Sequence, residues 1–255
     1  MNLIKFDFLS YGAGVQTSAI LCLYKEGKIS FKKAIFADTG AEPEYVYEHL
    51  SKMETLFPGL IIKTKKGQLL ENTFKEKFIT APVFSRIDDK NRRGRRVCTS
   101  RYKIYPVAKE IRKQINKTGK KLSENYIKLG LGFSTDESHR AKPNRIRWLQ
   151  NFYPLISLGY DRQRCESILR KHNIRPVRSA CFMCPFLADR EFLKMKKEHP
   201  KDFKKAVEFD KKIRNIKNHE NYLHRKMKPL DQIHFNKDIQ IDFFKTECET
   251  GFCGT

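Results

Sequence analysis

Short apolar runs alternate with segments of helical spacing through the first quarter of the chain. The run from Ile4 to Leu9 predicts a strand, and the stretch from Thr17 to Tyr24 predicts a helix. A second apolar run, Ala34 to Ala37, precedes a helix that is expected to begin near Pro43, and Leu60 to Ile62 predicts a third strand. This βαβαβ order predicts a parallel sheet with right-handed crossovers.

The rest of the chain adds one buried strand and several helices. Tyr126 to Leu131 predicts the strand, and a helix is expected before it, from about Arg101 to Asn116. A helix capped by Asp161 is expected to run to about His172, and the segment from Asp189 to Asn218 is strongly helical and basic. Residues 77–97 are expected to form a loop.

These elements predict an α/β fold of two parts. Residues 1–160 are expected to form a Rossmann-like parallel sheet flanked by helices, and residues 161–255 a helical C-terminal region that carries cysteines. Ligands of such sheets bind beyond the carboxyl ends of the strands. Polar segments follow three of the predicted strands, at Ser10 to Ser18, Asp38 to Gly40 and Gly132 to Arg140, so we expect these segments to meet at one edge.

The segment from Ser10 to Ser18 is a glycine-rich turn between a strand and a helix N-terminus. Gly12 and Gly14 would let the backbone approach a phosphate, and the free N–H groups and the helix dipole would point at it. A tight strand-to-helix turn also needs glycine for conformational reasons, so the loop alone leaves both interpretations open. Asp38 is likewise either an acceptor for a ribose hydroxyl or adenine amino group, or a helix N-cap.

Charge narrows the class of partner. The chain carries 52 Lys and Arg against 29 Asp and Glu, a net charge of +23, which favours nucleic acid or phosphate-rich small molecules. Solvated lysine-rich helix faces would give the same balance. Arg92 to Arg96 holds four arginines in five positions and suits bidentate phosphate binding, with a basic loop that has no ligand as the alternative. Glu137, His139 and Arg140 are candidates to contact phosphate, metal or base, or to cap their loop.

No apolar run approaches the roughly 20 residues of a membrane span, and no signal-peptide pattern is present. We therefore expect no membrane association and a cytoplasmic location. In that compartment the seven cysteines serve as metal ligands, reactive thiols or core residues rather than as disulfides. Cys22 and Cys165 lie within apolar helical patterns and are expected in the core.

The other five cysteines are candidates for chemistry. The spacing of Cys181 and Cys184 lets two thiolates bind one metal ion or cluster, without distinguishing zinc, an iron–sulfur cluster or a redox dithiol. Cys98 is the candidate for a third ligand. Cys248 and Cys253 lie on a short terminal tail, which suits either a sulfur-carrying thiol or a fourth ligand.

Several of these separated motifs together resemble one family, and the resemblance spans nearly the whole chain. The motifs are Ser10-Tyr11-Gly12-Ala13-Gly14-Val15-Gln16-Thr17-Ser18, Phe36-Ala37-Asp38-Thr39-Gly40-Ala41-Glu42, Arg96-Val97-Cys98-Thr99, Asp136-Glu137-Ser138-His139-Arg140-Ala141 and the pair Cys181 and Cys184. They resemble the PP-loop adenine nucleotide α-hydrolase superfamily, and within it the phosphoadenosine phosphosulfate (PAPS) reductase-like family. The resemblance implies a HUP/PP-loop type of fold with the nucleotide-binding domain in residues 1–160.

The resemblance implies an adenine nucleotide, ATP or PAPS, bound together with Mg²⁺. The implied nucleotide contacts are Ser10, Gly12, Gly14, Gln16, Thr17, Ser18, Asp38, Thr39, Arg96 and Arg140. The usual loop motif has an acidic residue where Gln16 stands. Catalytic roles are implied for Asp38 and for Cys248, because Thr246 to Cys248 is similar to the tail of sulfonucleotide reductases, whose cysteine attacks the sulfate sulfur.

The same resemblance implies a [4Fe-4S] cluster, with Zn²⁺ as the alternative. Sulfur-handling members bind the cluster through a cysteine site followed later in the chain by C-x-x-C, and the spacing of Cys98 and Cys181 fits that arrangement. Such members often have two adjacent cysteines, whereas here Cys98 is followed by Thr99. The fourth ligand would then be Cys253, Cys248 or a residue elsewhere.

Three functions remain open at this point. The first is ATP-dependent adenylation of an acceptor for sulfur transfer, with nucleic acid (DNA or tRNA) as a candidate acceptor and a sulfur-donor protein as a partner; the net charge and the Arg92 to Arg96 run favour it. The second is reduction of PAPS or adenylylsulfate, with Cys248 as nucleophile and a thioredoxin-like reductant. The third, a non-catalytic nucleic-acid-binding protein with structural zinc, leaves the strand-end motifs unexplained.

Overall fold

The computed structural model describes residues 3–75, 80–87, 90–119, 126–216 and 219–235. At its centre is a five-stranded sheet of order β5-β4-β2-β8-β9, in which every neighbouring pair is parallel. The strands are β2 (Phe8–Tyr11), β4 (Lys33–Phe36), β5 (Ile61–Lys63), β8 (Ile127–Gly130) and β9 (Leu149–Phe152). The predicted α/β fold with a parallel sheet is confirmed.

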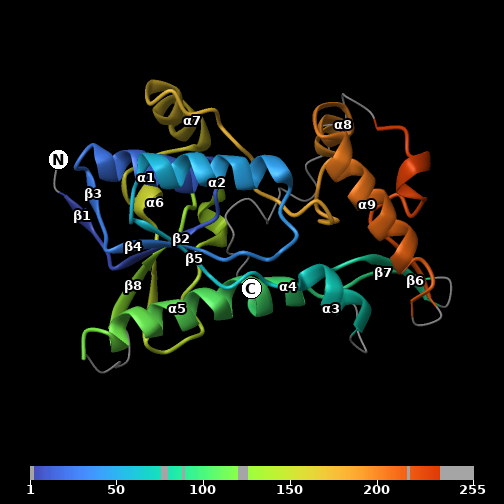
Figure 1. Cartoon of the computed structure of the whole chain (residues 1–255), viewed down its shortest axis with the longest axis horizontal. Coiled ribbons are helices and arrows are strands. Elements are labelled where there is room, and N and C mark those ends of the chain that lie inside the picture. Colours follow the sequence, from blue (N-terminus) through green and yellow to red (C-terminus); the bar gives the residue numbers. More distant parts are fainter. Residues whose placement is uncertain (1–2, 76–79, 88–89, 120–125, 217–218, 236–255) are drawn as a thin grey trace.

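Helices cover both faces of this sheet (Figure 1). One face carries α1 (Val15–Lys25), α2 (Glu44–Leu56), α6 (Pro154–Ser157) and α7 (Arg162–Lys171), and the other carries α5 (Tyr105–Asn116). The cap predicted for α7 is present, because the Asp161 side chain accepts a hydrogen bond from the backbone N–H of Arg164 at 2.6 Å. Cys22 and Cys165 are fully buried in the core between the sheet and its helices, as predicted.

The strand predicted from Ile4 to Leu9 is in two pieces. β1 (Ile4–Lys5) pairs with β3 (Ile29–Ser30), and the chain bends at Asp7 before β2 enters the main sheet. The Asp7 carboxylate accepts hydrogen bonds from the backbone N–H of Lys128 at 2.9 Å and from Lys32 Nζ at 2.8 Å. These bonds hold a charged residue at the surface and interrupt the strand there.

A second apolar core lies beside the sheet, on the right in Figure 1. It is enclosed by α3 (Leu69–Lys75), α8 (Asp189–Glu198), α9 (Pro200–Ile213) and the antiparallel strands β6 (Phe84–Ile87), β7 (Lys90–Arg93) and β10 (Glu220–Tyr222), which pair in the order β10-β6-β7. Residues before and after position 160 contribute to both cores: Ile168 and Leu169 of α7 pack into the first, and Leu69 and Tyr102 into the second.

One sequence prediction in this region was wrong. The loop expected at 77–97 contains the β6–β7 hairpin, whose other partner, β10, lies far along the chain, so that local sequence could not reveal the pairing. The segment from Asp189 to Asn218, predicted to be strongly helical, contains two helices that meet at His199–Pro200. Proline has no N–H to donate within a helix and instead occupies the first position of α9.

Short helical elements complete the chain. α4 (Val97–Thr99) and the π-helical turn η1 (Ser100–Ile104) lead without a break into α5, and the 3-10 helices are η2 (Thr135–Arg140) and η4 (Leu230–Gln232). Within the ranges that the structure describes, no helix is both long enough and apolar enough to cross a lipid bilayer.

Candidate active site at the carboxyl edge of the sheet

The segment from Ser10 to Ser18, here called the glycine loop, connects the carboxyl end of β2 to the N-terminus of α1. Gly14 is the N-cap of α1: its N–H donates to Thr17 Oγ1 and its carbonyl accepts from the same hydroxyl, both at 3.3 Å. A Cβ at Gly132, which follows β8, would lie 2.6 Å from Thr17 Cγ2. The loop is therefore fixed from two sides, with the first N–H groups of α1 at the edge where an anion would bind.

Ser18 lies in a buried hydrogen-bond chain. Its Oγ is 3.2 Å from the Tyr11 hydroxyl and 3.0 Å from Nε2 of His49, on α2. Burial lowers the pKa of His49 to about 4, so the imidazole is neutral at physiological pH. The chain links the glycine loop to α2. Its sequence signal was the helical spacing that placed His49 on the apolar face of this helix.

Gln16, which stands at the expected acidic position, is joined to an acidic residue from another segment. Its Nε2 donates to Glu137 Oε2 at 3.1 Å, and Glu137 is ion-paired with Arg140 within η2. The Arg140 guanidinium also lies over the ring of Phe133, 4.6 Å from its centre. The structure thus brings two of the predicted polar segments together and holds Arg140 in one orientation beside the loop.

A cavity of about 350 Å³, here called the loop chamber, opens at this point. It is lined by Val15, Gln16, Asp136, Glu137, His139, Arg140, Arg162, Glu166, Pro176, Arg178, Arg190, Glu191 and Lys194. Five of these side chains are cationic, and their carboxylate neighbours orient them: Arg162 Nε lies 3.2 Å from Glu166, and Arg178 is ion-paired with Glu191. Preoriented guanidinium groups next to a helix N-terminus can bind a polyphosphate.

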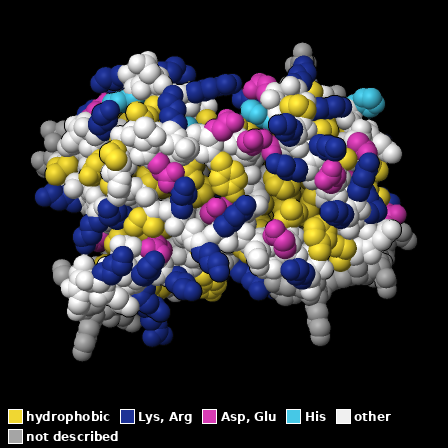
Figure 2. Space-filling model, viewed as in Figure 1, with side chains coloured by type: hydrophobic (Ala, Val, Ile, Leu, Met, Phe, Trp, Pro, Cys, Tyr) yellow, Lys and Arg dark blue, Asp and Glu magenta, His cyan; other side chains and the backbone are white. Residues whose placement is uncertain are grey.

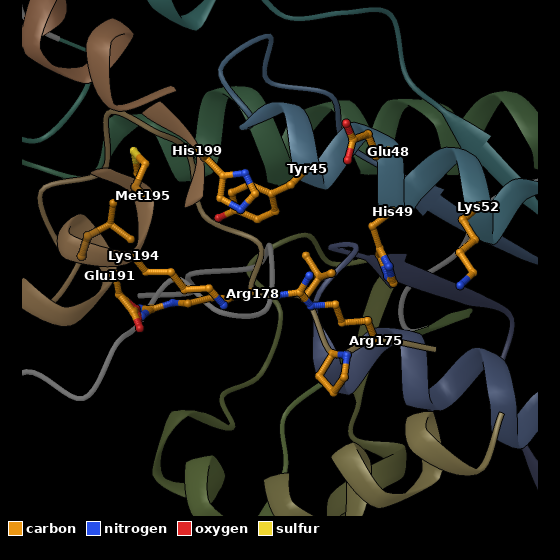
Figure 3. A pocket seen from close by; sticks show the side chains of 13 residues that line it. Tyr45, Glu48, His49, Lys52, Arg175, Arg178, Glu191, Lys194, Met195 and His199 are labelled. Atoms are coloured by element: carbon orange, nitrogen blue, oxygen red, sulfur yellow. The ribbon is translucent and has the colours of Figure 1, made fainter. Parts of the chain in front are cut away.

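A second cavity of about 310 Å³, the side chamber, adjoins the first (Figure 3). The two share Pro176, Arg178, Glu191 and Lys194. The remaining lining residues are Tyr45, Glu48, His49, Lys52, Arg175, Val177, Leu187, Met195 and His199. Sequence reasoning missed this chamber. The available signal was the basic segment from Arg175 to Arg178 immediately before the cysteine motif, which neither spacing nor charge density made prominent.

Asp38 follows β4 at the same edge of the sheet. Its Oδ1 accepts hydrogen bonds from the backbone N–H of Gly40 at 2.9 Å and from the Tyr47 hydroxyl at 2.8 Å. The N-cap interpretation of Asp38 was wrong, because the N-cap of α2 is Pro43. Gly40 has φ of +76° and a Cβ there would lie 2.2 Å from the Gly67 carbonyl oxygen, so glycine is required.

Cys98, Cys181 and Cys184 all line one small cavity of about 30 Å³, here called the cysteine cavity, together with Thr39 and Lys103. Cys181 Sγ lies 3.6 Å from both Thr39 Oγ1 and Glu42 Oε1. Burial, reinforced by the Glu42 carboxylate, raises the pKa of the Cys181 thiol well above its usual value. In the part of the chain that the structure describes, no three His, Cys, Asp or Glu side chains are spaced to hold a metal ion.

The Glu42 carboxylate is buried in the same wall. Thr39 Oγ1 donates to its Oε1 at 3.0 Å and Lys103 Nζ lies 4.0 Å from that oxygen, whereas its Oε2 has no hydrogen-bond partner among the residues that the structure describes. Arg96 lines this cavity, with its guanidinium 3.7 Å from the centre of the Phe186 ring. Cys248 and Cys253 fall outside the described residues.

The edge of the sheet therefore carries the loop chamber and the side chamber, which share lining residues, and Thr39, which follows β4, lines the cysteine cavity. A scan of protein-family models gives no match to this sequence, and a search of curated proteins gives none either.

Proposed function

We propose that the protein is an enzyme that binds an adenine nucleotide at the glycine loop and adenylates an acceptor for sulfur transfer. The observation that carries the proposal is the loop chamber, in which a helix N-terminus and five cationic side chains surround a space beside the strand ends. This is the chemistry of a polyphosphate site. The adenine nucleotide itself is inferred from the motifs of the glycine loop and of Asp38 to Gly40.

Attack on the α-phosphate of ATP releases pyrophosphate, whose negative charge must be stabilised as it leaves. Arg140 and Arg178 are held by Glu137 and Glu191, so their orientation does not have to be established during the reaction. Asp136 and Glu137 place carboxylate oxygens in the same chamber, the ligands that Mg²⁺ prefers. Glu137, positioned by Gln16, thus supplies acidity where the loop itself has an amide.

We assign the sulfur half of the reaction to the cysteine cavity, because three thiols, those of Cys98, Cys181 and Cys184, line it. Among the described residues no three such groups are spaced to hold a metal ion, so these thiols would have to converge, and the buried Cys181 thiol would have to lose its proton, to bind an iron–sulfur cluster or zinc. Thr39, which follows Asp38 in the chain, also lines this cavity.

The test is pyrophosphate release from ATP and Mg²⁺ in the presence of nucleic acid and a sulfide donor, with protein purified without oxygen. Arg140→Gln should lower the rate by about 10²-fold or more, as expected for loss of a group that stabilises transition-state charge. Lys204→Gln, an exposed change on α9, is the control. Absence of pyrophosphate with every acceptor refutes adenylation. Sulfite from labelled PAPS, lost in Cys248→Ser, would replace it with the reductase.

A further inference from the structure

We propose that the side chamber binds one nucleotide of the acceptor, a base with its phosphate, so that the acceptor is a nucleic acid presenting an unstacked base. This inference rests on the proposed function and extends it by naming the acceptor. It follows from three observations: an aromatic wall, a group of cations from separate elements, and the four lining residues that the side chamber shares with the loop chamber.

The aromatic wall comes from α2 and the start of α9. The rings of Tyr45 and His199 lie with their centres 4.4 Å apart and their planes inclined by 32°. Figure 3 shows the two rings one over the other at one side of the chamber, with Met195 nearby. Leu187 and Val177 add apolar surface. Flat aromatic surfaces of this kind bind nucleobases by stacking, largely irrespective of sequence.

The cations come from three separate parts of the chain. Lys52 is on α2, Arg175 and Arg178 precede the cysteine motif, and Lys194 is on α8. Within the described ranges, the ion pairs of Arg175 and Lys194 are long, exposed contacts to Glu198, at 3.5 and 3.9 Å. Exposed pairs of this kind contribute little to stability, so exchanging the carboxylate for a phosphate costs little.

The two chambers are adjacent, since they share four lining residues. Arg178 and Lys194 line both, so a group in the side chamber lies next to the end of the loop chamber that we assign to phosphate. The volume of about 310 Å³ is at the lower end of the roughly 300–1,000 Å³ typical of small-molecule sites. A sulfonucleotide alone would leave this second chamber without a role, whereas an adenylation reaction needs a place for the acceptor.

The acceptor's base must be accessible, because a base stacked inside a duplex cannot enter a chamber of this kind. The overall charge does not identify this place. Figure 2 shows Lys and Arg side chains distributed over the whole of one face of the molecule rather than gathered in one patch. That field would attract nucleic acid generally, and the side chamber would position a single nucleotide.

The experiment measures binding of fluorescein-labelled single-stranded RNA and DNA of the same sequence, by anisotropy, and of ATP, by calorimetry. Tyr45→Leu should weaken oligonucleotide binding between about 5-fold and 150-fold, the range for loss of one base–aromatic stack, while ATP binding stays within 2-fold. Tyr45→Phe keeps the ring and should bind normally. Tyr105→Leu, which removes an exposed tyrosine on α5, is the matched control.

A second measurement does not depend on a variant. RNA that carries 4-thiouridine is irradiated with the unaltered protein, and the crosslinked peptides are expected to contain Tyr45 or His199. Crosslinks only elsewhere, or equal binding by Tyr45→Leu and Tyr105→Leu, would overturn the side-chamber assignment. Weaker ATP binding with unchanged oligonucleotide binding would overturn it too, by placing the adenine there. Each of these results leaves the proposed function standing, because that function fails only on the pyrophosphate assay.

Discussion

Replacing Glu137 with glutamine is the most direct test of how the loop chamber is held together. Glu137 accepts from Gln16 and is ion-paired with Arg140, and these two charged side chains are only 14% and 9% exposed. Glutamine keeps the size and one carbonyl acceptor but removes the charge that compensates the guanidinium. Removing one partner of a buried ion pair costs about 3–5 kcal/mol, because the remaining charge is poorly solvated. Since some water reaches the pair, we expect about 3 kcal/mol for Glu137→Gln.

An exposed ion pair outside the chamber supplies a matched control. Glu220 on β10 pairs with Arg86 on β6 at 3.2 Å, and the two side chains are 53% and 46% exposed. An exposed pair contributes less than about 1 kcal/mol, so Glu220→Gln should be nearly silent. Urea unfolding followed by circular dichroism gives both free energies, provided that the denaturant dependence m is unchanged. Equal losses in the two variants would refute the argument that Glu137 holds a buried arginine.

The same pair of variants also tests function. If Glu137 orients Arg140 toward phosphate, Glu137→Gln should weaken ATP binding about 10-fold or more, the equivalent of one charge-assisted hydrogen bond, and Glu220→Gln, outside the chamber, should not. Calorimetric titration with MgATP measures both. Unchanged affinity in a folded Glu137→Gln protein would show that Arg140 does not act on the nucleotide through Glu137.

Three other predictions concern separate parts of the molecule. The free energy of unfolding should fall as pH drops from 6.5 toward 4. Burial lowers the pKa of His49 and of His224 to about 4, whereas histidines of the unfolded chain bind protons near pH 6.5, so each can contribute up to about 3 kcal/mol. Urea unfolding of His49→Gln should show a smaller loss of stability over this pH range. Cys98→Ser should lower the iron or zinc content of anaerobically purified protein, and Cys165→Ser should leave it unchanged, as metal analysis would show. Gly132→Ala places a Cβ against Thr17 and should lower the free energy of unfolding by about 1–3 kcal/mol, which thermal unfolding measures. An unchanged melting temperature would mean that the glycine loop shifts to accommodate the added Cβ.

Hydrophobic pattern predicted four of the five strands of the parallel sheet, because each of these βα units buries a short apolar strand whose residues are contiguous in the chain. It missed the edge strand β9, in which Gln150 and Asn151 interrupt the apolar pattern. It also missed the β6–β7 hairpin, which carries charged side chains and is fixed by β10 and by a buried hydrogen bond from Ser85 to Asn221, at 2.7 Å. No local periodicity encodes a strand whose partner is so far away.

The candidate site likewise has a part that the sequence predicted and a part that it did not. Strand-end logic correctly indicated that the glycine loop and the segment around Arg140 would meet, since the carboxyl ends of parallel strands share one edge. The side-chain partners were not accessible to that logic. His49 reaches Ser18 only because α2 packs beside α1, and Arg178 reaches the loop chamber only because the segment before the cysteine motif crosses this edge.

The hydrogen bond between Gln16 and Glu137 illustrates what a sequence motif can and cannot specify. In the loop motif a single position provides acidity, and glutamine at that position would suggest that the function is lost. In the folded chain the Gln16 amide donates to Glu137, so the carboxylate enters the same chamber from η2 and is paired there with Arg140. Chemistry at a sheet edge depends on which charges converge and not on which strand supplies them. The departure from the motif therefore leaves a nucleotide site at this edge, and ATP binding by Glu137→Gln and by its control Glu220→Gln tests it.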